Sequence, residues 1–314
     1  MTRPLYLFIG LRNEYVLAPL AQHFRTLGHD CLEVDFSIAG WRNPIAAAGE
    51  RPIVLITSHH PYMDRHVYRS CYGTTIDVMS VPEIIGWLKP VACYFVPHDL
   101  TEPLKPDEFS SLDLFNAIFM PNDDYWSFQR YTRVVKAGWI KATSTNKVEL
   151  PETFTIAFLP TEFGAYVQLG AAQFMQNFAP LLACKPVVKL VVLEGLEALS
   201  EDIRSCGCAL LPAQTLSSEV IQQASIVVTN AMSSIGVEAA LAGVPVICIE
   251  DGIHDPQLQR RAYAAYPEVR LMPCEAAARW LKTMQSDPSR CPPRLASEFV
   301  PFDFDGVTSL IVGG

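Results

Sequence analysis

The sequence is short of positive charge. It has 24 lysines and arginines against 33 aspartates and glutamates, so its formal net charge at pH 7 is −9. A surface of this sign repels nucleic-acid backbones and anionic lipid headgroups. The charge balance therefore disfavours general nucleic-acid binding and binding to a membrane surface.

Signals for export, membrane insertion and metal binding are also missing. The apolar run near the N-terminus is too short for a secretory leader and lacks a small-residue cleavage site. The apolar stretch from Ile226 to Ile249 is about long enough to span a bilayer. It is interrupted by Asn230 and Pro245, however, and its pattern predicts a strand, a turn, a helix and a second strand. Nine unevenly spaced cysteines indicate reduced thiols. We therefore expect a cytoplasmic protein without a transmembrane segment.

Several catalytic signatures are absent as well. The chain contains no G-x-G-x-x-G fingerprint, which argues against bound NAD. It also contains no P-loop and no G-x-S-x-G nucleophile elbow. Cys206 and Cys208 form a lone C-x-C, and the histidines at 59, 60 and 66 have no acidic ligand at a secure helical spacing. We expect no metal and no tightly bound cofactor.

What the chain does have is enough apolar sequence for two domains. Half of its 314 residues are hydrophobic and 18% are charged, so a sizeable core can form. Short β-rich runs alternate with helical patterns from end to end, which is typical of parallel α/β architecture. The predicted fold is α/β, with two Rossmann-like domains facing a cleft.

In the first half, helices are expected at Glu14–Leu27 and Val81–Leu88. The expected strands are Leu5–Ile9, Cys31–Phe36, Ile53–Thr57, Ala92–Val96, Ala117–Met120 and Val134–Ala137. The stretch Lys141–Glu152 is polar and without periodicity. It predicts a boundary between an acceptor-side domain, 1–145, and a nucleotide-donor domain, 146–314.

The alternation restarts after this boundary. Expected strands are Thr153–Leu159, Val187–Leu193, Ala209–Leu211, Ile226–Thr229 and Val244–Ile249. Expected helices are Ala165–Leu182, Leu196–Ser205, Leu216–Gln223, Ser234–Ala242, Pro256–Ala265 and Glu275–Gln285. After Ser286 the tail is rich in proline and aromatic residues, and we expect it to pack back across the molecule.

The most informative segment runs from Thr229 to Pro245. A buried strand enters a small polar turn, and a helix starts at the turn. The first turn of a helix presents backbone N–H groups and the positive end of the dipole, which suits phosphate. Ser233 and Ser234 add hydroxyl groups, and Glu238 lies one turn further along the face of Ser234, where it could accept bonds from ribose.

This segment resembles the donor-binding stretch of nucleotide-sugar enzymes with the glycosyltransferase B (GT-B) fold. It is most similar to the CDP-glycerol glycerophosphotransferase family, in which a Thr-Asp-x-Ser-Ser turn precedes an acidic residue and a Pro-Val strand start. Asn230 replaces the aspartate here, and one extra residue separates it from the serines. UDP-N-acetylglucosamine 2-epimerases share the fold and a related helix. The resemblance implies a donor site made of Thr229, Asn230, Ser233, Ser234, Gly236 and Glu238.

A second similar segment begins at His98. It resembles the His-Gly-x-Pro-Leu-Lys segment of the same transferases, although Asp99 stands in place of glycine and the spacing is two residues longer. A histidine just past a buried strand suits a general base near neutral pH, but a structural role is equally compatible with the sequence. Catalytic candidates are therefore His98 and Asp99. The further acceptor or cleft candidates are Gly10, Arg12, Asn13, His59, His60, Thr161 and Glu162.

The sequence thus predicts a glycosyl- or polyol-phosphate transferase that uses a nucleotide-activated donor of the UDP or CDP type as co-substrate. Two alternatives stay open. One is an epimerase acting on a UDP-sugar, and the other is a non-catalytic assembly or sensing protein on a degenerate scaffold. The acceptor and the oligomeric state, a homo-oligomer included, are also open.

Overall fold

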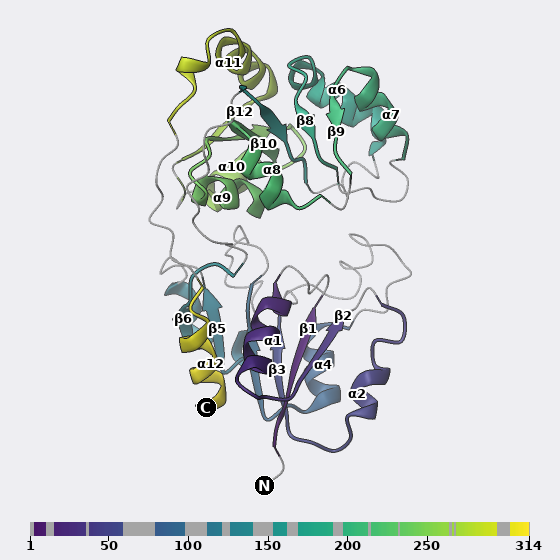
Figure 1. Cartoon of the computed structure of the whole chain (residues 1–314), viewed down its shortest axis with the longest axis vertical. Coiled ribbons are helices and arrows are strands. Elements are labelled where there is room, and N and C mark those ends of the chain that lie inside the picture. The colour runs from purple at the N-terminus through teal and green to yellow at the C-terminus, as the bar shows by residue number, and fades with distance from the viewer. Residues whose placement is uncertain are drawn as a thin grey trace. The chain divides into compact units, whose positions relative to one another are not determined.

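Two six-stranded parallel sheets organise the chain (Figure 1). The structure is a computed structural model that describes residues 3–10, 16–35, 38–58, 79–97, 112–120, 126–140, 153–161, 169–190, 197–212, 215–231, 233–263, 266, 268–293 and 302–313. Unit 1 contains the described residues up to 140 together with the last helix, and unit 2 contains those from 153 to 293. Each unit is α/β and Rossmann-like, as the sequence predicts.

The sheet of unit 1 has the strand order β2-β1-β3-β4-β5-β6. The strands are β1 (Leu5–Gly10), β2 (Cys31–Asp35), β3 (Ile53–Thr57), β4 (Ala92–Phe95), β5 (Ala117–Met120) and β6 (Val134–Lys136). The helices are α1 (Leu17–Thr26), α2 (Asn43–Ala47), α4 (Val81–Leu88) and α12 (Phe304–Gly313), with short 3₁₀ turns at Leu112–Leu114 and Trp126–Arg130. The order of the strands reverses between β1 and β3, so their carboxyl ends flank the switch point of this sheet.

Local sequence explains the sharp bounds of α4. The Ser80 hydroxyl accepts a bond from the Glu83 N–H, and the Glu83 carboxylate accepts one from the Ser80 N–H at 2.7 Å, which is a complete capping box. Lys89 ends the helix in the left-handed region with φ 46°.

The C-terminal helix α12 belongs to unit 1. Val307 and Ile311 are buried in the same cluster as Leu20 and Phe24 of α1. His23 Nε2 of α1 lies 3.2 Å from Asp305 Oδ1 at the start of α12. The chain therefore returns to its first unit after completing the second.

The sheet of unit 2 has the order β12-β11-β10-β7-β8-β9. Its strands are β7 (Ile156–Phe158), β8 (Val187–Val188), β9 (Ala209–Leu210), β10 (Ile226–Asn230), β11 (Val246–Glu250) and β12 (Val269–Pro273). Its helices are α6 (Ala171–Leu182), α7 (Glu197–Ser205), α8 (Ser217–Gln223), α9 (Ser234–Leu241), α10 (Pro256–Ala262) and α11 (Cys274–Ser286), with a 3₁₀ turn at Pro288–Arg290. Counted within the unit this is the 3-2-1-4-5-6 order of dinucleotide-binding sheets, with its switch point between β7 and β10.

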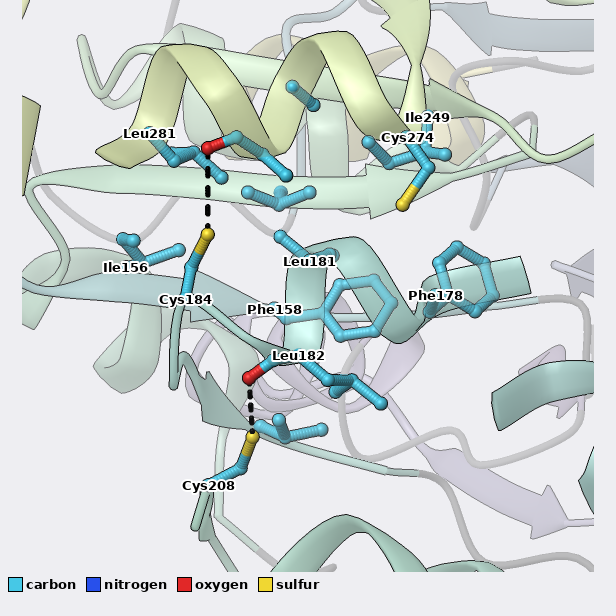
Figure 2. Close-up of a cluster of buried hydrophobic side chains, with 14 of the residues drawn as sticks. Ile156, Phe158, Phe178, Leu181, Leu182, Cys184, Cys208, Ile249, Cys274 and Leu281 are labelled. Atoms are coloured by element: carbon cyan, nitrogen blue, oxygen red, sulfur yellow. Dashed lines mark hydrogen bonds between the residues drawn. The ribbon is translucent and has the colours of Figure 1, made fainter. Parts of the chain in front are cut away.

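One face of this sheet packs on α6 and α11. Figure 2 shows Phe178, Leu181 and Leu182 of α6 in a cluster with Phe158 of β7 and Leu281 of α11. The thiols in the cluster act as small apolar groups with weak hydrogen bonds: Cys184 donates to the Ala278 carbonyl at 3.6 Å and Cys208 to the Leu182 carbonyl at 3.5 Å (Figure 2). All cysteines in the described ranges are free thiols.

Three elements are absent from the sequence prediction. They are α2, α12 and the edge strand β12. β12 is the short run Val269-Arg270-Leu271-Met272-Pro273, of which Val269 alone is buried, and only its parallel pairing with β11 identifies it as a strand. The predicted boundary at 141–152 lies outside the described residues. No helix in the described ranges is long and apolar enough to cross a membrane.

Candidate functional site

The switch point of unit 2 brings Thr161 and Asn230 together. Asn230 ends β10, Thr161 follows β7, and the carboxyl ends of these two strands are neighbours in the sheet. The Asn230 side chain accepts a bond from the Thr161 N–H at 2.8 Å and donates one to the Thr161 carbonyl at 3.3 Å. An amide can do both, whereas a carboxylate only accepts. This explains physically why asparagine suits the position where the resembling family has aspartate.

Asn230 also reaches a buried carboxylate. Its Nδ2 donates to Oδ2 of Asp251, the residue after β11, at 3.2 Å. His254 Nδ1 lies 2.9 Å from the same oxygen, and the Ile253 and His254 N–H groups donate to Oδ1 at 3.1 Å each. Burial alone would raise the pKa of the Asp251 carboxyl, but the hydrogen bonds and charge of His254 and the bond from Asn230 lower that pKa to about 2. Asp251 is therefore an ionised group that orients the His254 ring.

The turn between β10 and α9 is fixed by a left-handed residue and by a tyrosine. Ala231 has φ 56°, and Ser233 is the N-cap of α9. The Ser233 hydroxyl accepts a bond from the Ile235 N–H at 3.2 Å. Behind the turn, the buried Tyr263 hydroxyl accepts a bond from the Ser233 N–H at 2.8 Å and lies 2.9 Å from the Ser233 carbonyl.

Neighbouring side chains approach position 236 so closely that a side chain larger than hydrogen is tight there. A Cβ built there would lie 3.2 Å from the Thr229 methyl carbon and 3.2 Å from the Tyr263 hydroxyl oxygen. Thr229 is fully buried, and its hydroxyl donates to the Leu159 carbonyl at 3.0 Å. Thr229, Gly236 and Tyr263 thus hold the start of α9 against the end of β10.

The two serines of this turn have different surroundings. Ser233 is 4% exposed, and both its N–H and its hydroxyl are engaged in the bonds above. Ser234, the first residue of α9, is half-buried and takes part in neither bond. Glu238, one turn along α9, is also half-buried. Ser234 and Glu238 are therefore the half-buried polar residues near the start of α9, and Ile235 between them is half-buried as well.

Much of the predicted acceptor side lies outside the described residues. This applies to Arg12, Asn13, His59, His60, His98, Asp99 and Glu162. Gly10 is described: it is the buried last residue of β1, and it pairs with Asp35 of β2 next to the β1–β3 switch point. Across that switch point the Thr57 hydroxyl donates to the Ile9 carbonyl at 2.8 Å.

Sequence reasoning passed over Tyr263 and gave no role to Asp251 and His254. Tyr263, which follows α10, makes a long-range contact that no local pattern reveals. Asp251 and His254 carry a usable signal, because an acid and a histidine directly follow a buried parallel strand. Within the described ranges, no group of three or more histidine, cysteine or carboxylate side chains could hold a metal ion.

Comparison with solved structures gives the fold. A UDP-GlcNAc 2-epimerase from Methanocaldococcus jannaschii, in complex with UDP-GlcNAc and UDP, superposes with a TM-score of 0.59 at 9% identity over 99% of this chain and 100% of that one. MurG from Acinetobacter baumannii gives 0.51 at 13% identity, with 99% and 100% covered. The glycosyltransferase SnogD from Streptomyces nogalater gives 0.51 at 12% identity, with 100% of each chain covered.

The chain has the GT-B fold of nucleotide-sugar enzymes. This confirms the fold expected from the resemblance. Neither a protein-family model nor a curated protein sequence matches the chain. At 9–13% identity the solved structures show the fold alone, so the activity has to be argued from the site.

Proposed function

We propose that the protein is a GT-B transferase that binds a nucleotide-activated donor at the carboxyl edge of the unit 2 sheet. The observation that carries this proposal is the start of α9 beside the β7–β10 switch point, with Ser234 accessible and Ser233 used as the cap. Ligands of open parallel sheets bind beyond the strand ends at a switch point. Helix N-termini favour phosphate in particular.

In this scheme the donor diphosphate lies at the first turn of α9. The Ser234 hydroxyl and N–H would donate to phosphate oxygens, and the helix dipole would stabilise the charge that develops on the departing phosphate. Glu238 would accept bonds from the ribose hydroxyls. Thr229 and Gly236 serve this site from behind, because both are buried and they hold the start of α9 against β10, while the buried Asn230 joins Thr161 to Asp251.

Catalysis would rest on positioning and on electrostatic stabilisation, and neither needs a tightly bound metal. His98 is the proposed general base that would deprotonate the acceptor, with Asp99 next to it in sequence. The donor base, UDP or CDP, stays open, although three similar solved structures with TM-scores of 0.50 to 0.59 contain UDP, a UDP-sugar or a fluorinated UDP-sugar. A cytoplasmic location and a homo-oligomeric state remain predictions.

Epimerisation of a UDP-sugar is the second candidate, because the superposition with a 2-epimerase has a TM-score of 0.59 over nearly the full length of both chains. The two reactions differ in their products. In an epimerase, incubation with UDP-GlcNAc alone gives the 2-epimer, either still attached to UDP or as free sugar together with UDP, whereas a transferase releases the nucleotide only when an acceptor is supplied.

A thermal-shift panel of UDP, CDP, GDP and their sugars tests the proposal. A ligand at 100-fold excess over its Kd should stabilise the folded protein by about 2.7 kcal/mol. Stabilisation by one nucleotide series supports the donor site. Tight nucleotide binding without turnover of any donor would favour a non-catalytic sensing protein, and no stabilisation by any nucleotide would contradict the proposal.

A further inference from the structure

A pocket of about 250 Å³ lies at the amino edge of the unit 2 sheet. The end of α9, the starts of β11 and β12 and the middle of α11 line it, together with two prolines that follow the 3₁₀ turn at Pro288–Arg290. The proposed donor site is at the carboxyl edge. Because β11 is five residues long, the two edges are about 16 Å apart, so the pocket is separate from the donor site.

Most of the lining is apolar. Two of the wall residues are consecutive prolines, which have no backbone N–H to offer a ligand, and Trp280 of α11 is half-buried. The volume of about 250 Å³ is below the range of about 300–1,000 Å³ of ordinary ligand sites, so the occupant is smaller than a nucleotide-sugar. The apolar wall residues are Val244, Pro245, Val246, Trp280, Pro292 and Pro293.

Two of the described residues that line the pocket are charged, and their charges have opposite signs. Glu268 directly precedes β12, and Arg270 is the second residue of that strand. Both are exposed, and within the described part of the chain neither forms an ion pair. A simple anion in the pocket would face Glu268, and a simple cation would face Arg270. The pair therefore suits a ligand that carries both charges itself.

Arg270 is held against the ring of Trp280. Its guanidinium carbon lies 5.0 Å from the ring centroid. The register of the sheet explains this contact, because Arg270 pairs with Ile247, which belongs to the core cluster on the α6 and α11 face. A guanidinium that packs on an aromatic ring keeps the N–H groups of its edge for a carboxylate, which they can bind through two parallel hydrogen bonds.

We infer that this pocket binds a free α-amino acid with an apolar side chain. Arg270 would bind the carboxylate, Glu268 the ammonium group and the apolar walls the side chain. One residue separates Glu268 from Arg270, so their Cα atoms are at most about 7 Å apart. A free amino acid carries both charges on one carbon atom and fits this span, whereas the two termini of a peptide are further apart. The inference goes beyond the proposed function and does not depend on it.

Calorimetric titration of L-phenylalanine and L-leucine into the parent protein tests this inference. N-acetyl-L-phenylalanine and L-phenylalaninamide are the comparison ligands, because the first lacks the ammonium charge and the second lacks the carboxylate. We expect the parent to bind at least one of the two amino acids with a Kd of about 1 mM or tighter. Each comparison ligand should bind at least about 5-fold more weakly than L-phenylalanine.

Arg270→Gln and Glu268→Gln each remove one charge from the pocket. Arg279→Gln and Glu275→Gln are the matched controls, because both residues are exposed on α11 and neither lines the pocket. Both pocket variants should bind the amino acid at least about 5-fold more weakly than the parent. Both control variants should bind it like the parent.

The outcomes separate this inference from the proposed function. The inference is wrong if the parent binds neither amino acid, or if both folded pocket variants bind it as tightly as the parent. Equal binding of N-acetyl-L-phenylalanine would contradict the role of Glu268 and with it the choice of an amino acid. Excess UDP should not displace the amino acid, and competition between them would contradict a separate pocket. A parent that binds amino acid but no nucleotide would refute the donor site alone.

Discussion

Replacing each of the two neighbouring serines by alanine, one at a time, should separate the residue that stabilises the fold from the residue that binds the donor. Ser233→Ala and Ser234→Ala remove the same hydroxyl from adjacent residues, so each variant controls for the other. The Ser233 hydroxyl accepts the N–H of Ile235 and caps α9. The Ser234 hydroxyl takes no part in the cap.

The expected magnitudes follow from these surroundings. Loss of an N-cap serine costs about 0.5–2 kcal/mol, so Ser233→Ala should lower the free energy of unfolding by about 1 kcal/mol. Ser234→Ala should change it by less than about 0.5 kcal/mol. A hydrogen bond to a charged phosphate contributes about 1.5–3 kcal/mol, so Ser234→Ala should weaken diphosphate binding by about 10- to 150-fold.

The assay combines urea denaturation with calorimetric titration of a nucleoside and its diphosphate. Ser234→Ala should lose affinity for the diphosphate alone, and Ser233→Ala should lose mainly stability. Equal losses for nucleoside and diphosphate in Ser234→Ala would refute the phosphate contact. A stability loss in Ser234→Ala as large as that in Ser233→Ala would refute the assignment of the cap.

Three further predictions concern the groups behind the site. Tyr263→Phe keeps the ring but leaves the buried Ser233 N–H without its 2.8 Å partner. Urea denaturation should therefore show a loss of about 1–3 kcal/mol in the free energy of unfolding. An unchanged midpoint would contradict the role of the Tyr263 hydroxyl at this turn. Gly236→Ala should lower the free energy of unfolding by about 1 kcal/mol, because an overpacking cost of about 1–3 kcal/mol outweighs a helix-propensity gain of about 1 kcal/mol. Because the pKa of Asp251 falls from 3.8 to about 2 on folding, its contribution of about 2 kcal/mol should be present above pH 4 and disappear as the pH falls through 2. Asp251→Asn should lack this pH dependence, whereas the exposed control Asp113→Asn should retain it.

The sequence predicts the architecture well because both sheets are parallel and buried. Continuous apolar strands such as Ile53–Thr57 and Ala117–Met120 have the bounds expected from the sequence. The edge strand β12 escapes prediction because only one side of it is paired, and its exposed Arg270 breaks the apolar run. α12 escapes because Asp305, Gly306 and Gly313 weaken its local helical pattern, while its burial on α1 depends on residues about 280 positions away.

The site is predictable only in part, because some of its contacts join residues that are distant in sequence. A strand, a polar turn and a helix that begins at Ser234 can be predicted locally, and they are where the sequence places them. The burial of Thr229 and Asn230 depends on pairing between strands distant in sequence, and the contact from Tyr263 depends on how the residue after α10 packs behind the turn. No local pattern distinguishes Ser233 from Ser234, although their surroundings differ.

Calorimetric titration of nucleoside diphosphates into the parent and into Glu238→Gln tests the central claim most directly. The substitution keeps the size of the side chain and one acceptor oxygen but removes the charge. If unit 2 binds the donor through α9, the parent should bind UDP or CDP, and the variant should bind the same nucleotide about 10- to 150-fold more weakly. Equal affinity in a folded Glu238→Gln protein would contradict the donor site on α9.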